Sequence, residues 1–241
     1  MGRIALHSAL LENAHFRTVG DRGLLVEYGN AIDPVVNQKV RSISVAAEKN
    51  MPPGVVEIVP AYRSMMILYD PSVTTPKDLQ DAFISLEKKL HDIVIPVPRT
   101  VTIPVCYGGE FGPDIQVVAE SHALSIPDVI RLHSQPEYII YIIGFSPGFP
   151  FLGGLPKELH TPRLKTPRTA VPQGSVAIAN EQTGIYSVES PGGWQLIGRT
   201  PLKLFDPARP HPIPYRPGDL IRFVPISHDK YFQLLEKESM P

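Results

Sequence analysis

The chain carries the run Gly144-Phe145-Ser146-Pro147-Gly148-Phe149-Pro150-Phe151-Leu152-Gly153-Gly154 in its second half. Glycine permits backbone angles and close approaches that other residues forbid, while proline fixes φ and removes a hydrogen-bond donor. Neither a helix nor an ordinary strand tolerates this alternation, so the run predicts a rigid, irregular loop that presents aromatic rings. Irregular surface segments are where binding sites concentrate. We therefore expect the function to depend on this loop.

The stretch around this loop could be mistaken for a membrane span. Residues Tyr138–Pro156 carry no charge, and about 20 apolar residues suffice to cross a bilayer. The prolines and glycines of the loop, however, prevent a continuous helix from satisfying its backbone hydrogen bonds. We interpret Tyr138–Ile143 as a buried strand that leads into the loop, and we predict no contact with a membrane.

Composition agrees with a globular protein of two domains. Hydrophobic residues make up 43% and charged residues 20% of the 241 residues, and domains commonly hold about 100–150 residues. The formal net charge of −1 favours neither nucleic acid nor an anionic membrane as a partner. The single cysteine, Cys106, excludes an internal disulfide. With no recognisable signal sequence, this predicts a cytoplasmic location.

The distribution of proline marks the domain boundary. Of the 27 prolines, 21 lie from Pro96 onward, and Pro96 and Pro98 themselves resemble a stiff linker. We predict an N-terminal domain over residues 14–95 and a C-terminal domain over residues 99–235.

The N-terminal half has regular patterns of helices and strands. Asp33 and Thr75 are placed to cap two helices, each with proline at the first helical position. The predicted order is a strand at Leu24–Tyr28, a helix, strands at Val55–Val59 and Ser64–Tyr69, a second helix and a closing strand. This order is typical of a ferredoxin-like α/β domain. The whole chain is thus of the α+β class.

The C-terminal half predicts short strands separated by turns. We expect Asp114 and Ser125 to cap two short helices, and the tail from Ser227 to form another. The predicted strands are Thr100–Val105, Tyr138–Ile143, Ser175–Ala179, Ile185–Val188, Trp194–Arg199, Lys203–Phe205 and Leu220–Val224. Many short strands with closely spaced glycine and proline turns favour a closed or nearly closed β-barrel.

Familiar catalytic motifs are missing from the sequence. It contains no nucleotide-binding glycine loop of the P-loop or Rossmann type, no His-Glu-x-x-His pair and no Gly-x-Ser-x-Gly elbow. We expect no metal on this chain. If the protein uses ATP, a partner chain is expected to bind it.

Three polar clusters remain, and we expect them to surround one pocket with the aromatic loop. In the basic run His160–Arg168, Arg163 and Arg168 could bind a carboxylate or phosphate, although a solvated basic loop is the simpler interpretation. In Val171–Tyr186, uncharged groups could orient a small polar ligand, with ordinary turn chemistry as the alternative. In Glu189–Thr200, Glu189 is the acid–base candidate.

The resulting site hypothesis assigns four groups of residues. The catalytic candidates are Glu189 and Arg168. The substrate-binding candidates are Arg163, Gln173, Ser175, Gln182 and Tyr186. The candidates for a groove that binds a partner are Phe145, Pro147, Phe149 and Trp194, although these aromatic rings could instead fill the core. No residue is assigned to a metal.

The long motifs resemble one family. Gly144–Gly154, Cys106–Asp114 and Glu189–Thr200 are similar to the allophanate hydrolase subunit 1-like proteins, which include the B-type subunits of 5-oxoprolinase and the kinase inhibitor KipI. The similarity runs from about Arg17 to Val224. It implies an N-terminal α/β domain and a cyclophilin-like β-barrel domain.

The resemblance implies two alternative functions. The first is that of the B-type subunit in an ATP-dependent 5-oxoprolinase complex, which converts 5-oxo-L-proline to L-glutamate together with A-type and C-type subunits. The second is inhibition of autophosphorylation by a sensor histidine kinase, as in the KipI-like regulators of sporulation. The chain alone is expected to be inactive as an enzyme.

Overall fold

The computed structural model describes residues 14–29, 32–90 and 97–239. The chain forms two compact units that divide after Val97. No helix in these ranges is both long enough and apolar enough to cross a lipid bilayer.

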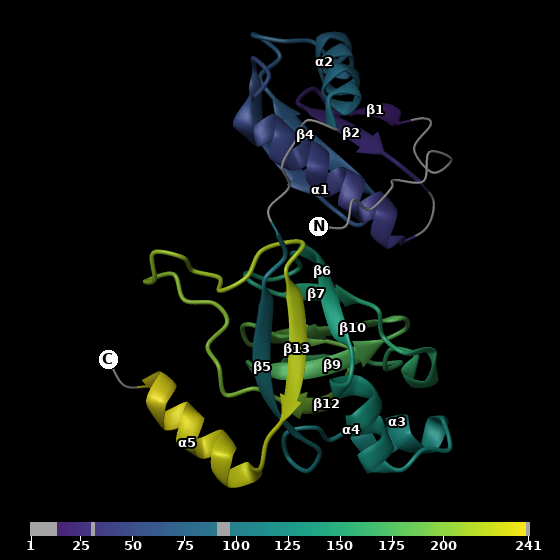
Figure 1. Cartoon of the computed structure of the whole chain (residues 1–241), viewed down its shortest axis with the longest axis vertical. Coiled ribbons are helices and arrows are strands. Elements are labelled where there is room, and N and C mark those ends of the chain that lie inside the picture. The colour runs from purple at the N-terminus through teal and green to yellow at the C-terminus, as the bar shows by residue number, and fades with distance from the viewer. Residues whose placement is uncertain (1–13, 30–31, 91–96, 240–241) are drawn as a thin grey trace. The chain divides into compact units, whose positions relative to one another are not determined.

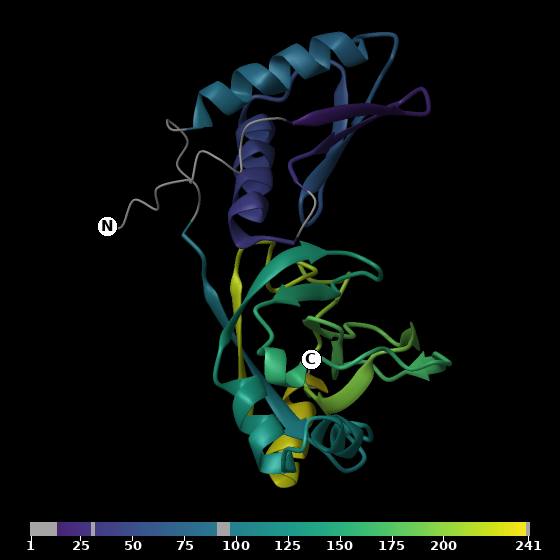
Figure 2. The ribbon, with the colours of Figure 1, turned by 90° about the vertical axis from the view of Figure 1, so that its right-hand side faces the viewer.

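The N-terminal unit is a four-stranded antiparallel sheet with two helices on one face. The sheet order is β1-β2-β4-β3. The elements are β1 (His15–Val19), β2 (Gly23–Glu27), α1 (Pro34–Lys49), β3 (Val55–Pro60), β4 (Ser64–Tyr69) and α2 (Pro76–Lys88). The apolar faces of both helices pack on the same face of the sheet (Figure 2). Val40 and Phe83 are fully buried there.

Both predicted helix caps of this unit are confirmed. The Asp33 carboxylate accepts hydrogen bonds from the backbone N–H groups of Val35 and Val36, at 2.7 and 3.2 Å. The Thr75 hydroxyl accepts from the N–H of Asp78 at 3.2 Å. Each cap satisfies donors of the first helical turn that have no partner within the helix.

The complete ferredoxin-like order is not confirmed. Strands β2 and β3, joined by α1, flank β4 as a split β-α-β unit requires. The edge position beside β2 is occupied by β1, an N-terminal strand that the sequence analysis did not predict. The closing strand predicted after α2 falls on residues 91–96, outside the described residues.

The C-terminal unit confirms the predicted barrel. Among the described residues, seven strands close in the order β10-β7-β6-β13-β5-β12-β9. They are β5 (Thr100–Tyr107), β6 (Glu137–Ile143), β7 (Pro150–Gly153), β9 (Ser175–Ala179), β10 (Gln182–Ile185), β12 (Gln195–Arg199) and β13 (Leu220–Pro225). Strands β5 and β13 run parallel and side by side (Figure 1).

The remaining elements surround the barrel. A two-stranded ribbon pairs β8 (Arg168–Val171) with β11 (Ser190–Gly192). The helices are α3 (Ile115–Ser121), α4 (Ile126–Ser134) and α5 (His228–Ser239), with a 3₁₀ turn at Lys157–Leu159. The Ser125 cap of α4 and the tail helix α5 are confirmed.

Four local predictions for this unit are wrong. The predicted irregular loop Gly144–Gly154 is a strand in part, because Pro150–Gly153 forms β7 of the barrel. Lys203–Phe205 forms no strand. The strand predicted at Ile185–Val188 ends at Ile185 and begins earlier, at Gln182. Asp114 precedes α3, but its side chain caps no N–H group of that helix, because its carboxylate is bound to Arg168 instead.

A buried histidine lies between α4 and the barrel. The ring of His133 stacks on Phe223 at a centroid distance of 4.6 Å. The Thr183 hydroxyl donates to the Ala177 carbonyl, so it accepts from His133 Nε2–H at 2.9 Å. His133 Nδ1 then accepts from the Tyr107 hydroxyl at 2.8 Å. Burial lowers the pKa of His133 to about 3, so the ring is neutral and both its nitrogens are satisfied.

Candidate functional site

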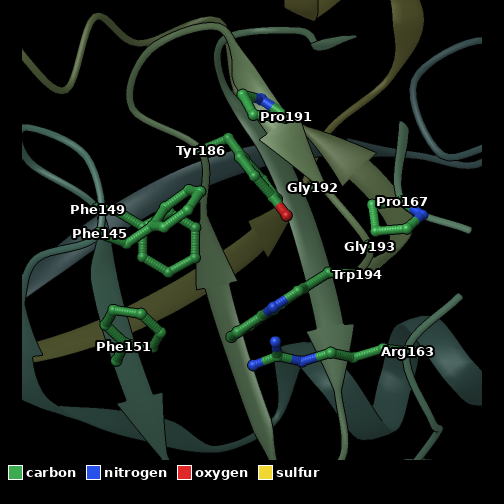
Figure 3. A pocket seen from close by; sticks show the side chains of 10 residues that line it. All are labelled: Phe145, Phe149, Phe151, Arg163, Pro167, Tyr186, Pro191, Gly192, Gly193 and Trp194. Atoms are coloured by element: carbon green, nitrogen blue, oxygen red, sulfur yellow. The ribbon is translucent and has the colours of Figure 1, made fainter. Parts of the chain in front are cut away.

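A cavity of about 210 Å³ opens beside the β8–β11 ribbon. Its lining residues are Phe145, Phe149, Phe151, Arg163, Pro167, Tyr186, Pro191, Gly192, Gly193 and Trp194 (Figure 3). The aromatic loop and all three polar clusters contribute to it. The expected shared pocket is therefore present, although the second cluster reaches it only through Tyr186.

Phe149 is the centre of the aromatic wall. Its ring meets Tyr186 and Trp194 edge to face, at centroid distances of 5.2 and 5.5 Å, and lies 4.7 Å from Phe151. Such arrangements place the positive ring edge against the negative ring face and stabilise the cluster. Phe149 and Trp194 are both buried, so these rings form core and cavity wall at once.

Phe145 stands at the mouth of the cavity in a strained conformation. Its φ is +67°, a left-handed conformation that costs a non-glycine residue roughly 1–2 kcal/mol. The side chain is 65% exposed and meets Phe149 edge to face. A hydrogen bond holds the loop in place, because the Tyr215 hydroxyl donates to the Gly148 carbonyl at 2.7 Å. The fold thus holds an exposed ring where a ligand would enter.

Glycine at position 192 is required by Tyr186. A Cβ atom on Gly192 would lie 2.1 Å from the Tyr186 hydroxyl oxygen and 2.7 Å from its ring. Burial raises the pKa of Tyr186, and the Trp194 backbone N–H and the charges of Arg163 and Arg168 offset this only in part. Tyr186 is therefore a neutral, closely packed wall of the cavity.

Arg163 is the cation of the cavity. Its guanidinium lies 5.8 Å from the Trp194 ring centroid, a cation–π contact. Ion pairs among the described residues do not include Arg163, so its charge has no carboxylate partner there. Its loop is held in place, because the Leu164 N–H donates to the Gly193 carbonyl at 2.7 Å. An anionic group of a ligand would complete this site.

Arg168, predicted to act beside Arg163, is engaged elsewhere. Its Nη2 donates to both carboxylate oxygens of Asp114, at 2.7 and 2.9 Å. The side chain does not line the cavity. Sequence reasoning assigned Asp114 to a helix cap and missed this partner, because nothing local links residues so far apart in the chain.

The other predicted site residues lie away from the cavity. Glu189 and Pro147 are exposed and do not line it. Gln173 lines a second hollow, beside Tyr231 of α5. Ser175 is fully buried in β9, and Gln182 is half-buried at the start of β10. The structure thus brings together Arg163, Tyr186, Phe145, Phe149 and Trp194, but not these five residues.

The lining has a clear chemical character. Among the described residues it offers aromatic rings, one guanidinium and one neutral phenol, and no carboxylate, histidine, serine or cysteine. In the described ranges, no three His, Cys, Asp or Glu side chains are grouped so as to hold a metal ion. The cavity suits recognition of a flat ligand with a negative charge, whereas a general base would have to come from outside it.

This barrel, with its attached α/β unit, matches a family of carboxyltransferase domains. The family model "Carboxyltransferase domain, subdomain C and D" matches residues 14–215, and the chain belongs to this family. The B-type subunit of 5-oxoprolinase from Bacillus subtilis (strain 168) is 40% identical over 231 residues, which cover 92% of this chain and 96% of that protein. The protein of the same name from Escherichia coli O157:H7 is 48% identical over 176 residues, covering 72% and 79%. These relatives confirm the resemblance.

A solved structure shares the fold. TTHA0988 superposes with a TM-score of 0.76 at 36% sequence identity, covering 86% of this chain. The chain spans only 40% of TTHA0988. In that protein, the part that corresponds to this chain is therefore joined to a larger remainder in one polypeptide.

Proposed function

We propose that the chain is the B-type subunit of a cytoplasmic, ATP-dependent 5-oxoprolinase complex that opens 5-oxo-L-proline to L-glutamate. The observation that carries the proposal is the aromatic cavity with Arg163, whose charge has no carboxylate partner among the described residues, in a chain that matches proteins of that name over nearly its whole length. One A-type and one C-type partner protein complete the complex. One of them binds ATP, and this chain alone is inactive.

The cavity would bind both the ring and the carboxylate of the substrate. In this proposal the Arg163 guanidinium moves off the face of Trp194. It then forms two parallel hydrogen bonds to the substrate carboxylate. Phe145 and Trp194 cover the faces of the flat lactam ring. The volume of about 210 Å³ admits a five-membered ring with one carboxylate.

The proton-transfer groups belong to the assembled complex. No described lining residue can act as a base at neutral pH, so a partner supplies the base, or Glu189, which does not line the cavity, moves to reach the substrate. The substrate-binding roles of Gln173, Ser175 and Gln182 stay predictions. Replacing each by alanine in the reconstituted complex tests them.

Reconstitution tests the main proposal. This chain is mixed with the A-type and C-type partner proteins, ATP and 5-oxoproline, and glutamate formation is followed. We expect turnover only with all three proteins. R163Q should raise the KM for 5-oxoproline about 10- to 100-fold, since a hydrogen bond to a charged group contributes about 1.5–3 kcal/mol. K165Q, which removes an exposed cation from the same loop, is the matched control. Absence of glutamate in the complete mixture would refute the proposal.

One observation supports a second candidate, inhibition of a sensor histidine kinase. Phe145 is exposed in a strained conformation at the cavity mouth, and strain of this kind persists where it serves a contact. Of the four groove candidates, Phe145 and Pro147 are exposed and could meet a partner helix. Kinase autophosphorylation measured with the wild-type chain and with F145A tests this role. Equal phosphorylation with and without an excess of the chain would exclude it.

A further inference from the structure

The ion pair between Asp114 and Arg168 joins segments that are distant in the sequence. Both carboxylate oxygens accept from Arg168 Nη2, at 2.7 and 2.9 Å. One of them, Oδ2, also accepts from the Leu196 N–H at 2.7 Å, while the Asp114 N–H donates to the Leu196 carbonyl at 2.9 Å. The side chains are 11% and 29% exposed. A buried carboxylate with this many partners ties α3, β8 and β12 together.

The Arg168 side of the pair reaches the cavity wall without entering the cavity. Arg168 begins β8 and lies opposite Gly192 of β11. Its Nη1 donates to the Trp194 carbonyl at 3.4 Å. Gly192, Gly193 and Trp194 line the cavity where the chain passes from β11 to β12. Arg168 therefore contacts the segment Gly192–Trp194 at its first and its last residue.

The same wall carries the loop of Arg163. The Leu164 N–H donates to the Gly193 carbonyl at 2.7 Å, and the Gln195 side-chain amide donates to the Pro162 carbonyl at 2.9 Å. Arg163 lies between these two hydrogen bonds, and its guanidinium lies over Trp194. A shift of the Gly193–Trp194 wall would therefore move the cation of the cavity.

We infer that Asp114 and Arg168 are a positioning pair, which holds the Gly193–Trp194 wall and through it places Arg163 for an anionic ligand. Asp114 neutralises Arg168, and neither side chain lines the cavity. Arg168 is thus assigned a positioning role in place of the predicted catalytic one. The consequence for substrate affinity rests on the proposed function, whereas the effect on the wall concerns the isolated full chain.

Trp194 is the only tryptophan of the chain, so its fluorescence reports on this wall alone. The variants are R168Q, R168K and D114N. The matched control is R99Q, which breaks another ion pair of the same unit, Arg99 Nη2 to Asp219 at 2.7 Å with the aspartate side chain 2% exposed. In R168Q and D114N we expect a red-shifted emission and severalfold stronger quenching by acrylamide. R168K keeps the charge but reaches fewer acceptors, so its quenching should be intermediate, while R99Q should match the wild type.

Kinetics of the reconstituted complex separate positioning from catalysis. R168Q should raise the KM for 5-oxoproline about tenfold and leave kcat nearly unchanged, with R168K recovering part of the loss. If Trp194 is quenched equally in R168Q, R99Q and the wild type, the inference is wrong. A loss of kcat at unchanged KM would make Arg168 a reacting group instead. Should R168Q not fold, R168K and D114N carry the same test. A complex without turnover refutes the proposed function, while the quenching experiment still decides the inference.

Discussion

Local side-chain contacts are prominent in the N-terminal unit, and long-range contacts surround the cavity of the barrel unit. In the N-terminal unit, Ser42 and Ser44 donate to carbonyls one helical turn back, and Asp33 and Thr75 cap the helices that follow them. Long-range contacts of this unit come from α1, where Asn37 donates to the Ala61 and Tyr62 carbonyls and Lys39 pairs with Glu87. In the barrel unit, buried polar groups bond to residues far away in the sequence. These pairs are His133 with Tyr107 and Thr183, Asp114 with Arg168, and Asp219 with Arg99.

The long-range bonds of the barrel unit help to build its cavity. Contacts within one element stabilise that element but position nothing beyond it, whereas a bond between distant segments sets their relative placement. The cavity is built from segments that span residues 145–194, so it needs bonds of the second kind. The N-terminal unit can lose a local contact and keep its sheet, while loss of the Asp114–Arg168 pair is expected to move the cavity wall of the barrel unit.

The largest expected effect is G112A, in the barrel unit. A Cβ atom at this position would lie 2.1 Å from the Ile197 carbonyl oxygen and 2.2 Å from its carbon. Backbone of a closed barrel cannot yield, so we expect a loss of about 3 kcal/mol in the free energy of unfolding. The comparison is G29A in the N-terminal unit, where the nearest atom is 3.7 Å away and the change should stay within about 0.5 kcal/mol. Urea unfolding measures both. Equal losses would contradict the contrast between the units.

The next effect is a dependence of barrel stability on pH. Burial lowers the pKa of His133 to about 3, whereas the unfolded histidine titrates near 6.5. Below that pH the unfolded chain binds a proton at His133 that the native state does not bind. The free energy of unfolding is therefore highest above about pH 6.5 and falls as the pH drops. Between pH 6.5 and 5 the loss should be about 2 kcal/mol. Urea unfolding followed by Trp194 fluorescence measures it.

The variant H133Q is the control for this dependence. Glutamine keeps a donor and an acceptor but does not titrate, so its unfolding free energy should fall less over the same pH range. An identical slope in H133Q and the wild type would show that other groups cause the dependence.

A smaller effect is expected from the helix cap T75A. The Thr75 hydroxyl accepts from the Asp78 N–H, and loss of such a cap costs about 1 kcal/mol. T75S keeps the hydroxyl and should restore most of it. Because the contact is local, acrylamide quenching of Trp194 should not change in either variant. A change in quenching would show that local contacts of the first unit also shape the cavity.

The fold could be predicted from sequence where its determinants are local. Asp33, Thr75 and Ser125 were identified as caps because each cap and its partners lie within one turn. Turn residues at short spacing likewise predicted most of the barrel strands, but not β7, whose residues were assigned to the aromatic loop. Strand β1 was missed, because its mostly exposed residues show no apolar alternation. Asp114 was assigned to a cap, since its real partner, Arg168, belongs to another element.

The same distinction between local and long-range determinants applies to the candidate site. Phe149 and Trp194 were found because aromatic rings between glycines and prolines leave a visible pattern, and Tyr186 was found as one of the uncharged polar groups of Val171–Tyr186. Gln173 and Ser175 were grouped with them as polar residues near a glycine. Such a pattern does not reveal which side of a strand a residue faces, and Ser175 faces the protein interior.

The smallest expected effect comes from a surface ion pair in the N-terminal unit. Lys77 Nζ lies 3.1 Å from Asp81 on the exposed face of α2, with side chains 76% and 61% exposed. Water and salt screen such a pair, so D81N should cost only about 0.3 kcal/mol, and less at high salt. D219N removes the buried partner of Arg99 and should cost several times more, with little dependence on salt. Urea unfolding at low and high ionic strength measures both. If D81N costs as much as D219N, burial is not what makes the Arg99–Asp219 pair of the barrel unit important for stability.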